Sequence, residues 1–347
     1  MLQLLLGGSG SGKTTLLYQR IRARAEKGEK SILLVPEQFT SSTEGRIYRE
    51  LGDALSGMVE SFSFTSLAEK ILSTEGGAAV QTLSDAGRAV LVRRALEELQ
   101  DNVHYYHRHR RSAAFCQMAA QTIDELKSAG LSGQQLAQLA GACGAESGKL
   151  SELALIFQGY ETLLARSGMD PSDRLELAGA RLEEALARHS LPEFLRDRAV
   201  FIDEFDTFNA PKKRLLGAML AALPSVTVAL CDDGAPLLPG DLSLFSGAKQ
   251  VAAQLRQLAR KNGAEVAVPQ LLRKDLRHRN APGLAAVAEL LETGSCTADA
   301  PAGEVRLFAA PSREEEARAA AGAIRRLMRQ GVRCGKIAVV CRDIAKY

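Results

Sequence analysis

The segment GGSGSGKT at residues 7–14 limits most strongly what this chain can fold into, because it fits the pattern G-x-x-x-x-G-K-[ST]. An apolar run at residues 2–6 precedes it and predicts a buried strand, and residues 15–21 have the apolar spacing of a helix. A glycine loop between a strand and a helix turns backbone N–H groups toward one point, where the helix N-terminus adds a partial positive charge. The sequence therefore predicts a site for the phosphates of a nucleoside triphosphate.

Two side chains at the end of this loop have specific predicted roles. Lys13 is expected to bridge the β- and γ-phosphates of ATP, and the Thr14 hydroxyl is expected to bind Mg²⁺. A glycine–serine turn can match the pattern by chance, but the strand and the helix on either side favour the phosphate loop. The predicted nucleotide-binding residues are Gly7, Gly8, Ser9, Gly10, Ser11, Gly12, Lys13, Thr14 and Thr15.

A pair of carboxylates predicts the second half of the same site. Residues 199–202 form a short apolar run, and Asp203 and Glu204 follow it directly. Parallel α/β sheets place their ligands at the carboxyl ends of the strands. We therefore expect Asp203 to hold Mg²⁺ and Glu204 to orient or deprotonate a water, so that Lys13, Asp203 and Glu204 are the predicted catalytic residues. The alternative is a buried strand that ends in a solvated acidic turn.

The pattern of apolar residues changes along the chain. Residues 1–80 and 196–295 alternate strand-like and helical patterns, which predicts an α/β domain whose parallel sheet is covered by helices on both faces. Residues 81–195 show only helical patterns and predict a large all-helical insertion in that domain. The predicted helices of the insertion lie at residues 84–99, 112–129, 150–167 and 172–189.

The last part of the chain predicts the truncated start of a second α/β domain, at residues 300–347. Its pattern is a strand at 305–309, a helix at 313–329 and a strand at 337–340. A lone β-α-β unit leaves most of its apolar face unpaired. We therefore expect the chain to be an N-terminal fragment of a longer protein.

Composition narrows the cell compartment more than the partners. With 44 Lys and Arg against 41 Asp and Glu, the net charge is +3, so any DNA contact must come from local patches. The 6 cysteines form no C-x-x-C pair, which argues against a disulfide framework or a zinc or iron–sulfur site in this chain. No apolar run approaches the ~18 residues that span a membrane, and the N-terminus reads as a core strand instead of a signal peptide. These features predict a cytoplasmic protein with no membrane contact.

The long helical insertion between Lys13 and Asp203, followed by a second α/β unit, is the layout of superfamily 1 DNA helicases, which have a UvrD-like fold. Within that layout the chain resembles the AddB/RexB family. The resemblance rests on the phosphate loop, on LLVPEQ at residues 33–38, on Ser61-Phe62, on IDEF at residues 202–205 and on the stretch 312–347. It runs along the whole chain, and Pro36-Glu37-Gln38 is its more specific mark.

This resemblance implies a fold and a function. It implies a RecA-like P-loop NTPase domain (1A-like), the helical insertion (1B-like) and the start of a second RecA-like domain (2A-like). Members form the second component of a bacterial ATP-dependent helicase–exonuclease, a hydrolase that processes double-strand DNA breaks for homologous recombination and DNA repair. The implied partners are single-stranded DNA from broken duplex ends and the AddA/RexA helicase–nuclease protein, in a heterodimer. The family's nuclease domain and its iron–sulfur cluster lie far toward the C-terminus, so this fragment is expected to be at most a weak ATPase without a nuclease site.

The chain also departs from the pattern of active helicases. It lacks a glutamine motif before the phosphate loop, and Glu204 stands where family members often have glycine. No glutamine follows Asp232 and Asp233, so these two residues are expected to form a turn. Arg277 or Arg279 lies where helicases place an arginine that reaches the γ-phosphate. An active superfamily 1 helicase motor, a P-loop kinase and a scaffold that binds ATP without turnover remain the alternatives.

Two exposed segments are candidates for contact with DNA. Gln38 and Thr40 can hydrogen-bond phosphate, and Phe39 and Phe62 can stack on bases, unless these residues form a packed loop with aromatics in the core. Residues 104–111, HYYHRHRR, interleave cations with aromatics. That segment is open to three interpretations: a solvated loop, a DNA or partner contact, or a metal site.

Overall fold

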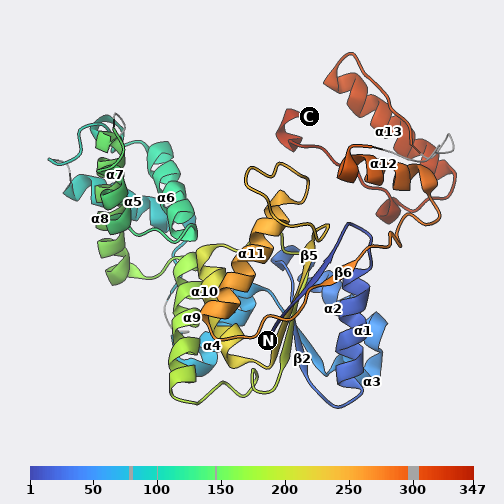
Figure 1. Ribbon diagram of the computed structural model, residues 1–347. Helices are drawn as coiled ribbons and strands as arrows, with labels where there is room; N and C mark the ends of the chain where they lie inside the picture. Colours follow the sequence, from blue (N-terminus) through green and yellow to red (C-terminus); the bar gives the residue numbers. More distant parts are fainter. Residues whose placement is uncertain (78–80, 100, 145–146, 296–304) are drawn as a thin grey trace. The chain divides into compact units, whose positions relative to one another are not determined.

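A six-stranded sheet, parallel throughout, forms the centre of the N-terminal part of the computed structural model (Figure 1). The structure describes residues 1–77, 81–99, 101–144, 147–295 and 305–347, and these form two compact units, Met1–Arg277 and His278–Tyr347. The order of strands across the sheet is β3-β2-β4-β5-β1-β6. The strands are β1 (Leu2–Gly7), β2 (Ser31–Leu34), β3 (Val59–Phe62), β4 (Ala199–Ile202), β5 (Ser225–Cys231) and β6 (Gln270–Leu272).

The register of the sheet brings distant loops to one edge. Gly7 lies opposite Cys231, and Leu34 lies opposite Ile202, in pairs of parallel strands. The loops that follow β1, β2, β4 and β5 therefore leave the sheet at the same edge. This edge is where parallel α/β sheets hold their ligands.

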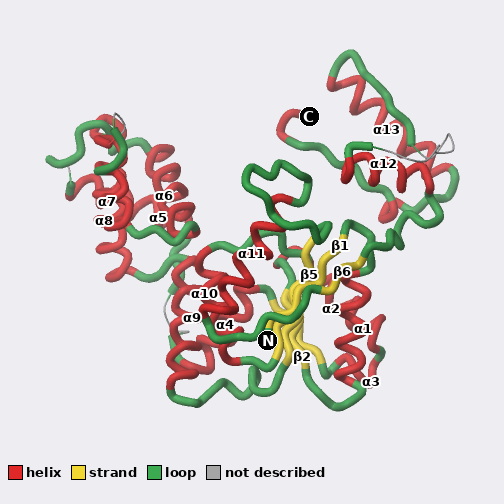
Figure 2. The backbone as a smooth tube through the Cα atoms, viewed as in Figure 1, coloured by secondary structure: helices red, strands yellow, loops and turns green. Residues whose placement is uncertain are grey.

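Helices cover both faces of the sheet, as the sequence predicted (Figure 2). Successive side chains of a strand point to opposite faces, so Leu4 packs with α4, α9, α10 and α11 while Leu5 packs with α1 and α2. Both leucines are buried, which explains why the strands are continuous apolar runs without polar alternation. The helices are α1 (Lys13–Ala25), α2 (Thr40–Leu51), α3 (Asp53–Ser56), α4 (Phe64–Glu75), α9 (Pro171–Ala187), α10 (Ala210–Ala222) and α11 (Ser246–Lys261), with a 3-10 turn at Glu37–Phe39.

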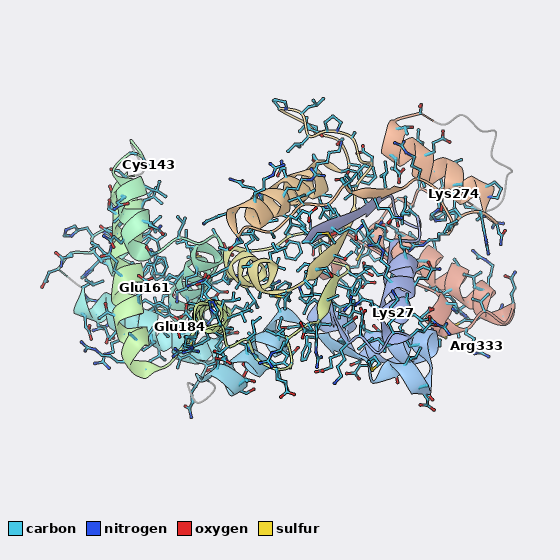
Figure 3. The ribbon with its side chains drawn as sticks, turned by 60° about the horizontal axis from the view of Figure 1, so that its bottom comes forward. Lys27, Cys143, Glu161, Glu184, Lys274 and Arg333 are labelled. Atoms are coloured by element: carbon cyan, nitrogen blue, oxygen red, sulfur yellow. The ribbon has the colours of Figure 1, made fainter. Side chains whose placement is uncertain are left out.

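A separate cluster of helices has its own apolar core. It contains α5 (Asp85–Glu98), α6 (Ala113–Ser128), α7 (Gly133–Ala140) and α8 (Ser147–Ser167). Serine side chains before α5, α6 and α7 accept hydrogen bonds from backbone N–H groups of the first turn, which fixes where these helices begin. Side chains also join the helices: Glu161 of α8, labelled in Figure 3, accepts a hydrogen bond from the Gly133 N–H at the start of α7.

The helix α9 differs from the others of the predicted insertion. Leu175, Ala178 and Leu182 of α9 belong to the core that covers the sheet, and α9 packs against α4 and α10. The cluster with its own core therefore ends with α8, although residues 172–189 were predicted to belong to the insertion. The reason is that an amphipathic helix packs against the nearest apolar surface, which the sequence pattern of the helix does not identify.

A buried carboxylate shapes the exposed segment 104–111. Glu152 of α8 is 6% exposed and accepts hydrogen bonds from the backbone N–H groups of His104, Tyr105 and Tyr106, at 2.7–3.2 Å. The start of the segment is thereby held on α8, while most of its side chains, including Tyr105, remain exposed. Among the described residues, no group of three or more acidic, histidine or cysteine side chains is arranged to hold a metal ion.

Replacing Glu152 by alanine is expected to lower the free energy of unfolding by about 2–3 kcal/mol, because three backbone N–H groups lose their acceptor. Urea denaturation measures this value. Glu98→Ala is the matched control, since Glu98 is half-exposed in an i,i+4 pair with Arg94 and its loss is expected to change stability by about 0.5 kcal/mol or less. Equal effects of the two substitutions would show that the Glu152 contacts do not stabilise the fold.

The second unit, His278–Tyr347, corrects part of the prediction for the end of the chain. It contains the helices α12 (Pro282–Thr293) and α13 (Arg313–Arg329) and two 3-10 turns, Cys334–Lys336 and Ile344–Lys346. The helix predicted at 313–329 is confirmed, but the described residues at 305–309 and 337–340 form no strand. A strand exists only when its backbone N–H and C=O groups pair with a neighbour, and these two segments have none within the described residues.

The boundary between the two units lies after Arg277, before the boundary that the sequence predicted at 295. The predicted start of the second domain, at residue 300, lies outside the described residues. In the described parts of the chain, no helix combines the length and the apolar character needed to pass through a bilayer.

Candidate functional site

The glycine loop after β1 turns sharply and opens into a cavity of about 530 Å³. Gly10 and Gly12 have φ angles of 80° and 91°, in the left-handed region where a Cβ is strained. Space is also short, because a Cβ added to Gly10 would lie 2.6 Å from the Cβ of Arg277. Gly12 directly precedes α1, so the helix N-terminus faces the cavity. The residues of the predicted loop that line the cavity are Ser9, Gly10, Gly12, Lys13, Thr14 and Thr15.

The polar groups of this loop fit a phosphate. Within the described residues, no hydrogen-bond acceptor meets the backbone N–H groups of Gly10, Gly12 and Thr14. The Oγ atom of Ser11 is buried and has no hydrogen-bond partner in the described residues. Buried polar groups normally have partners, so the loop presents donors that an anion can satisfy.

Gly7 and Gly8 contribute through their carbonyl groups. The Lys13 Nζ donates hydrogen bonds to the Gly7 and Gly8 oxygens, at 2.7 and 2.8 Å. Neither glycine lines the cavity. The ammonium group is thus held beside the loop, at the point where phosphate oxygens are expected to bind.

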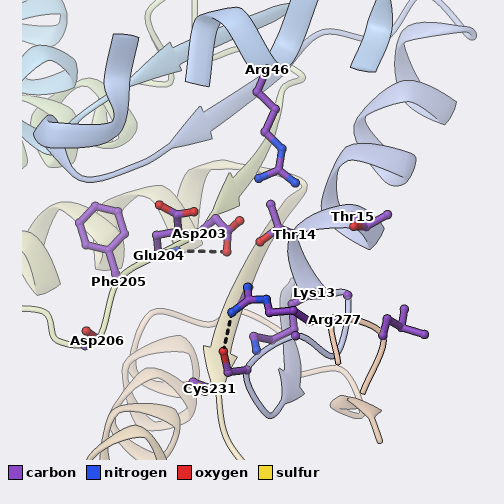
Figure 4. Close-up of a pocket in the computed structure, with 15 residues that line it drawn as sticks. Lys13, Thr14, Thr15, Arg46, Asp203, Glu204, Phe205, Asp206, Cys231 and Arg277 are labelled. Carbon is purple, nitrogen blue, oxygen red and sulfur yellow. Dashed lines mark hydrogen bonds between the residues drawn. The ribbon is translucent and has the colours of Figure 1, made fainter. Parts of the chain in front are cut away.

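Asp203 lies at the end of β4 and faces the same cavity as Thr14 (Figure 4). The carboxylate is 6% exposed, and its Oδ1 accepts a hydrogen bond from the Glu204 N–H at 3.1 Å. Burial raises the pKa of Asp203, while hydrogen bonds from the Thr14 side chain and the Glu204 N–H, and the charges of Arg46 and Lys13, lower it. The fold therefore brings together an aspartate and a hydroxyl that are far apart in the sequence.

Glu204 is exposed and lines the cavity beside Asp203. Its φ angle is 65°, in the left-handed region that costs a residue with a Cβ about 1–2 kcal/mol. A glycine would adopt this conformation without strain. Desolvation and the neighbouring Asp203 carboxylate raise the pKa of Glu204, and Arg46 lowers it. The backbone thus holds a carboxylate at the cavity in a conformation that a glycine would tolerate better.

Two arginines complete the cavity. Arg277 follows β6, and its Nη1 donates to the Ser9 Oγ at 3.0 Å, while the preceding Leu276 N–H donates to the Gly10 oxygen at 3.0 Å. Arg277 was one of two arginines that sequence reasoning considered for this site, and it lines the cavity. Arg46 of α2 was missed, because no motif surrounds it and only the packing of α2 brings it to the cavity.

The residues predicted to contact DNA differ in their surroundings. Gln38 and Phe39 lie in an exposed 3-10 turn after β2, and Thr40 begins α2, at the same edge of the sheet as the cavity. Phe39 is 37% exposed. Phe62, in contrast, is half-buried, and its ring centre lies 6.5 Å from that of Phe194. Phe39 thus offers a ring face to solvent more readily than Phe62 does, and the DNA-contact role of all four residues stays a prediction.

Asp232 and Asp233, at the end of β5, form the turn that the sequence predicted. The Asp232 Oδ1 accepts a hydrogen bond from the Gly234 N–H at 2.7 Å, and the Asp233 Oδ1 accepts one from the Ala235 N–H at 2.8 Å. Asp233 also pairs with Lys249 of α11. Both carboxylates therefore stabilise the local chain, and neither is among the residues that line the cavity.

Comparison with known proteins identifies the family. The model of the family "ADDB, N-terminal" matches residues 4–288. Three relatives are the AddB proteins, each an ATP-dependent helicase/deoxyribonuclease component, of Desulforudis audaxviator, Symbiobacterium thermophilum and Moorella thermoacetica. Across all of this chain they are 34%, 33% and 32% identical to it, respectively. The chain spans only about 30% of the length of these curated relatives. From the glycine loop into α12 it matches one family model, and the chain therefore belongs to the AddB family, whose N-terminal region it represents.

Proposed function

We propose that this chain is the nucleotide-binding region of an AddB-type helicase/deoxyribonuclease component, with a RecA-like P-loop NTPase domain that binds MgATP. The observation that carries the proposal is the shared cavity of Thr14 and Asp203, beside a loop whose N–H groups lack acceptors within the described residues. The proposed ligands of Mg²⁺ are the Thr14 hydroxyl and the Asp203 carboxylate, both oxygen donors of the kind that Mg²⁺ prefers. Bound Mg²⁺ would neutralise part of the phosphate charge.

The proposed roles of the other residues follow from their positions. Lys13 would exchange its bonds with the Gly7 and Gly8 carbonyls for bonds with phosphate oxygens. Glu204, exposed beside Asp203, would orient a water or accept its proton. We assign no nuclease chemistry and no iron–sulfur cluster to residues 1–347.

The biological setting is also a proposal. The names of the relatives describe components of an ATP-dependent helicase and deoxyribonuclease. By this likeness the whole protein would work with an AddA/RexA partner in the cytoplasm and process double-strand DNA breaks for recombinational repair. Gln38, Phe39 and Thr40 would contact single-stranded DNA at the edge of the sheet that also holds the nucleotide.

An active helicase motor is the second candidate, and Glu204 favours it. The chain keeps a carboxylate at a strained position beside Asp203, where it is placed to act on water. A scaffold that only binds ATP would not need this side chain. ATP hydrolysis that single-stranded DNA stimulates would support the motor, and MgATP binding without turnover would support the scaffold.

The experiment that tests the proposed site is a titration of the protein with a fluorescent ATP analogue, in Mg²⁺ and in EDTA. We expect binding that unlabelled ATP reverses and that depends on Mg²⁺. Asp203→Asn is expected to weaken binding in Mg²⁺ by at least about tenfold and to remove the difference between Mg²⁺ and EDTA, because loss of even an indirect metal partner has an effect of this size.

Asp206→Asn is the matched control for Asp203→Asn. Asp206 lines the same cavity, but its carboxylate is exposed and lies beyond the end of β4. We expect its variant to retain Mg²⁺-dependent binding. No nucleotide binding by the wild-type protein would refute the proposed function, and an Asp203 variant with full Mg²⁺ dependence would remove Asp203 from the metal site.

A further inference from the structure

Arg46 of α2 points into the cavity and has no anionic partner within the described residues. Figure 4 shows its guanidinium directed at Thr14 and Asp203, with Arg46 and Lys13 on opposite sides of Thr14. Among the described residues, none forms a hydrogen bond or an ion pair with this guanidinium. Asp203 and Glu204 are close enough for Arg46 to lower the pKa of each carboxyl group. Its N–H donors are therefore available to a ligand in the cavity.

Other half-buried arginines of the same unit are satisfied by the protein. Arg20 of α1 donates to the Gln3 Oε1 at 2.7 Å and to the Gln270 Oε1 at 2.5 Å. Arg198, before β4, pairs with Glu60. A half-buried guanidinium loses part of its hydration, so it normally gains such partners. The lack of one at Arg46, among the residues that the structure describes, distinguishes it from these arginines.

Tyr18 holds Arg46 in this orientation. The Arg46 Cζ lies 4.8 Å from the centre of the Tyr18 ring, and Tyr18 is 5% exposed on α1. Burial, with smaller effects of Asp203 and Glu204, raises the pKa of Tyr18 to about 12, so the ring remains a neutral phenol at physiological pH. A cation above an aromatic face keeps its N–H edge free for other acceptors. Tyr18 thus orients Arg46 without using its donors.

The charge of the cavity indicates what Arg46 binds. Lys13 already supplies a cation beside the glycine loop, where the inner phosphates of a nucleotide are expected. A second cation with free donors, across Thr14 from Lys13, is suited to the additional charge that a triphosphate has and a diphosphate lacks. The planar guanidinium can bind two phosphate oxygens at once, which an ammonium group cannot do.

We propose that Arg46 contacts the terminal phosphate of ATP, so that α2 distinguishes the triphosphate from the diphosphate. This inference rests on the proposed nucleotide site. Because α2 begins at Thr40, beside Gln38 and Phe39, the helix that senses the terminal phosphate also begins at the candidate DNA contact.

The test compares the affinities for MgATP and MgADP in the wild-type protein and in Arg46→Ala, by competition with a fluorescent nucleotide. We expect the substitution to weaken MgATP binding by about 10–100-fold, the effect of losing charge-assisted hydrogen bonds. The affinity for MgADP is expected to change by about threefold or less, which also shows that the variant is folded. Arg46→Lys should restore only part of the loss, because it keeps the charge without the planar donors.

Three further variants complete the test. Arg49→Ala removes an exposed arginine from the same helix and should leave both affinities unchanged. Tyr18→Phe keeps the aromatic face and should behave as wild type, while Tyr18→Leu should reduce the preference for ATP. An unchanged ratio of ATP to ADP affinity in Arg46→Ala would overturn the inference while the nucleotide site stands, whereas a wild-type protein that binds neither nucleotide would refute the proposed function itself.

Discussion

Replacing Lys13 by alanine is expected to lower the affinity for MgATP by about 100-fold or more, because charge-assisted hydrogen bonds with two phosphates are lost together. Both MgATP and MgADP should be affected, since the ammonium lies beside the loop where the inner phosphates are expected. Calorimetric titration of the wild-type and variant proteins measures the effect. This pattern separates Lys13 from Arg46, whose loss should affect MgATP alone.

Lys27→Ala is the control for the Lys13 variant. Lys27, labelled in Figure 3, is an exposed lysine just after the C-terminal end of α1, away from the glycine loop. Its variant removes the same charge and should bind nucleotide like the wild-type protein. Circular dichroism and urea denaturation establish that both variants are folded. Equal nucleotide affinity of the Lys13 and Lys27 variants would exclude a phosphate-binding role for Lys13.

Lys127→Met is expected to lower the free energy of unfolding by about 3–5 kcal/mol, the typical effect of leaving a buried charge without its partner. Lys127, at the end of α6, donates to the Asp170 Oδ2 at 2.8 Å and to both oxygens of Asp173 at 2.9 Å. Asp170 is 1% exposed and accepts a second bond from the Tyr160 hydroxyl at 2.6 Å. This network joins α6, α8 and the start of α9, where the helical cluster meets the helices that cover the sheet.

Urea denaturation of three variants tests this network. Lys27→Met, on the surface, should change stability by about 0.5 kcal/mol or less. The double substitution Lys127→Met with Asp170→Asn should be less destabilised than the sum of its single variants, because it removes both members of the buried pair. Additive effects would show that Lys127 and Asp170 do not stabilise each other.

The same network predicts how stability depends on pH. Burial lowers the pKa of Lys127, but the hydrogen bonds and charges of Asp170 and Asp173 raise it further, so the pKa in the folded protein lies above that of an ordinary lysine. A raised lysine pKa stabilises the folded state fully below the ordinary value, about 10.4, and this stabilisation is lost as the pH rises through the folded value. Wild-type protein should therefore lose stability at alkaline pH more steeply than Lys127→Met.

Local patterns were enough to predict most elements of the first unit. The apolar runs at 2–6 and 199–202 predicted β1 and β4, because strands buried on both faces need apolar side chains at every position. Two elements were missed. The strand β6 (Gln270–Leu272) has only 3 residues and exists through its pairing with β1, and α7 (Gly133–Ala140) has 8 residues and packs on α8. Such short elements depend on contacts that no local pattern contains.

By itself, the sequence determined the glycine loop, the acidic end of β4 and the family, because a glycine at positive φ, an apolar strand and a helix start are all properties of neighbouring residues. Only the tertiary structure decided which side chains meet at the cavity. Asp203 reaches Thr14 because parallel pairing aligns the ends of β1, β4 and β5, and Arg46 reaches both because α2 packs beside α1. These distances depend on the packing of helices on a sheet, a long-range property that the order of residues along the chain does not specify locally.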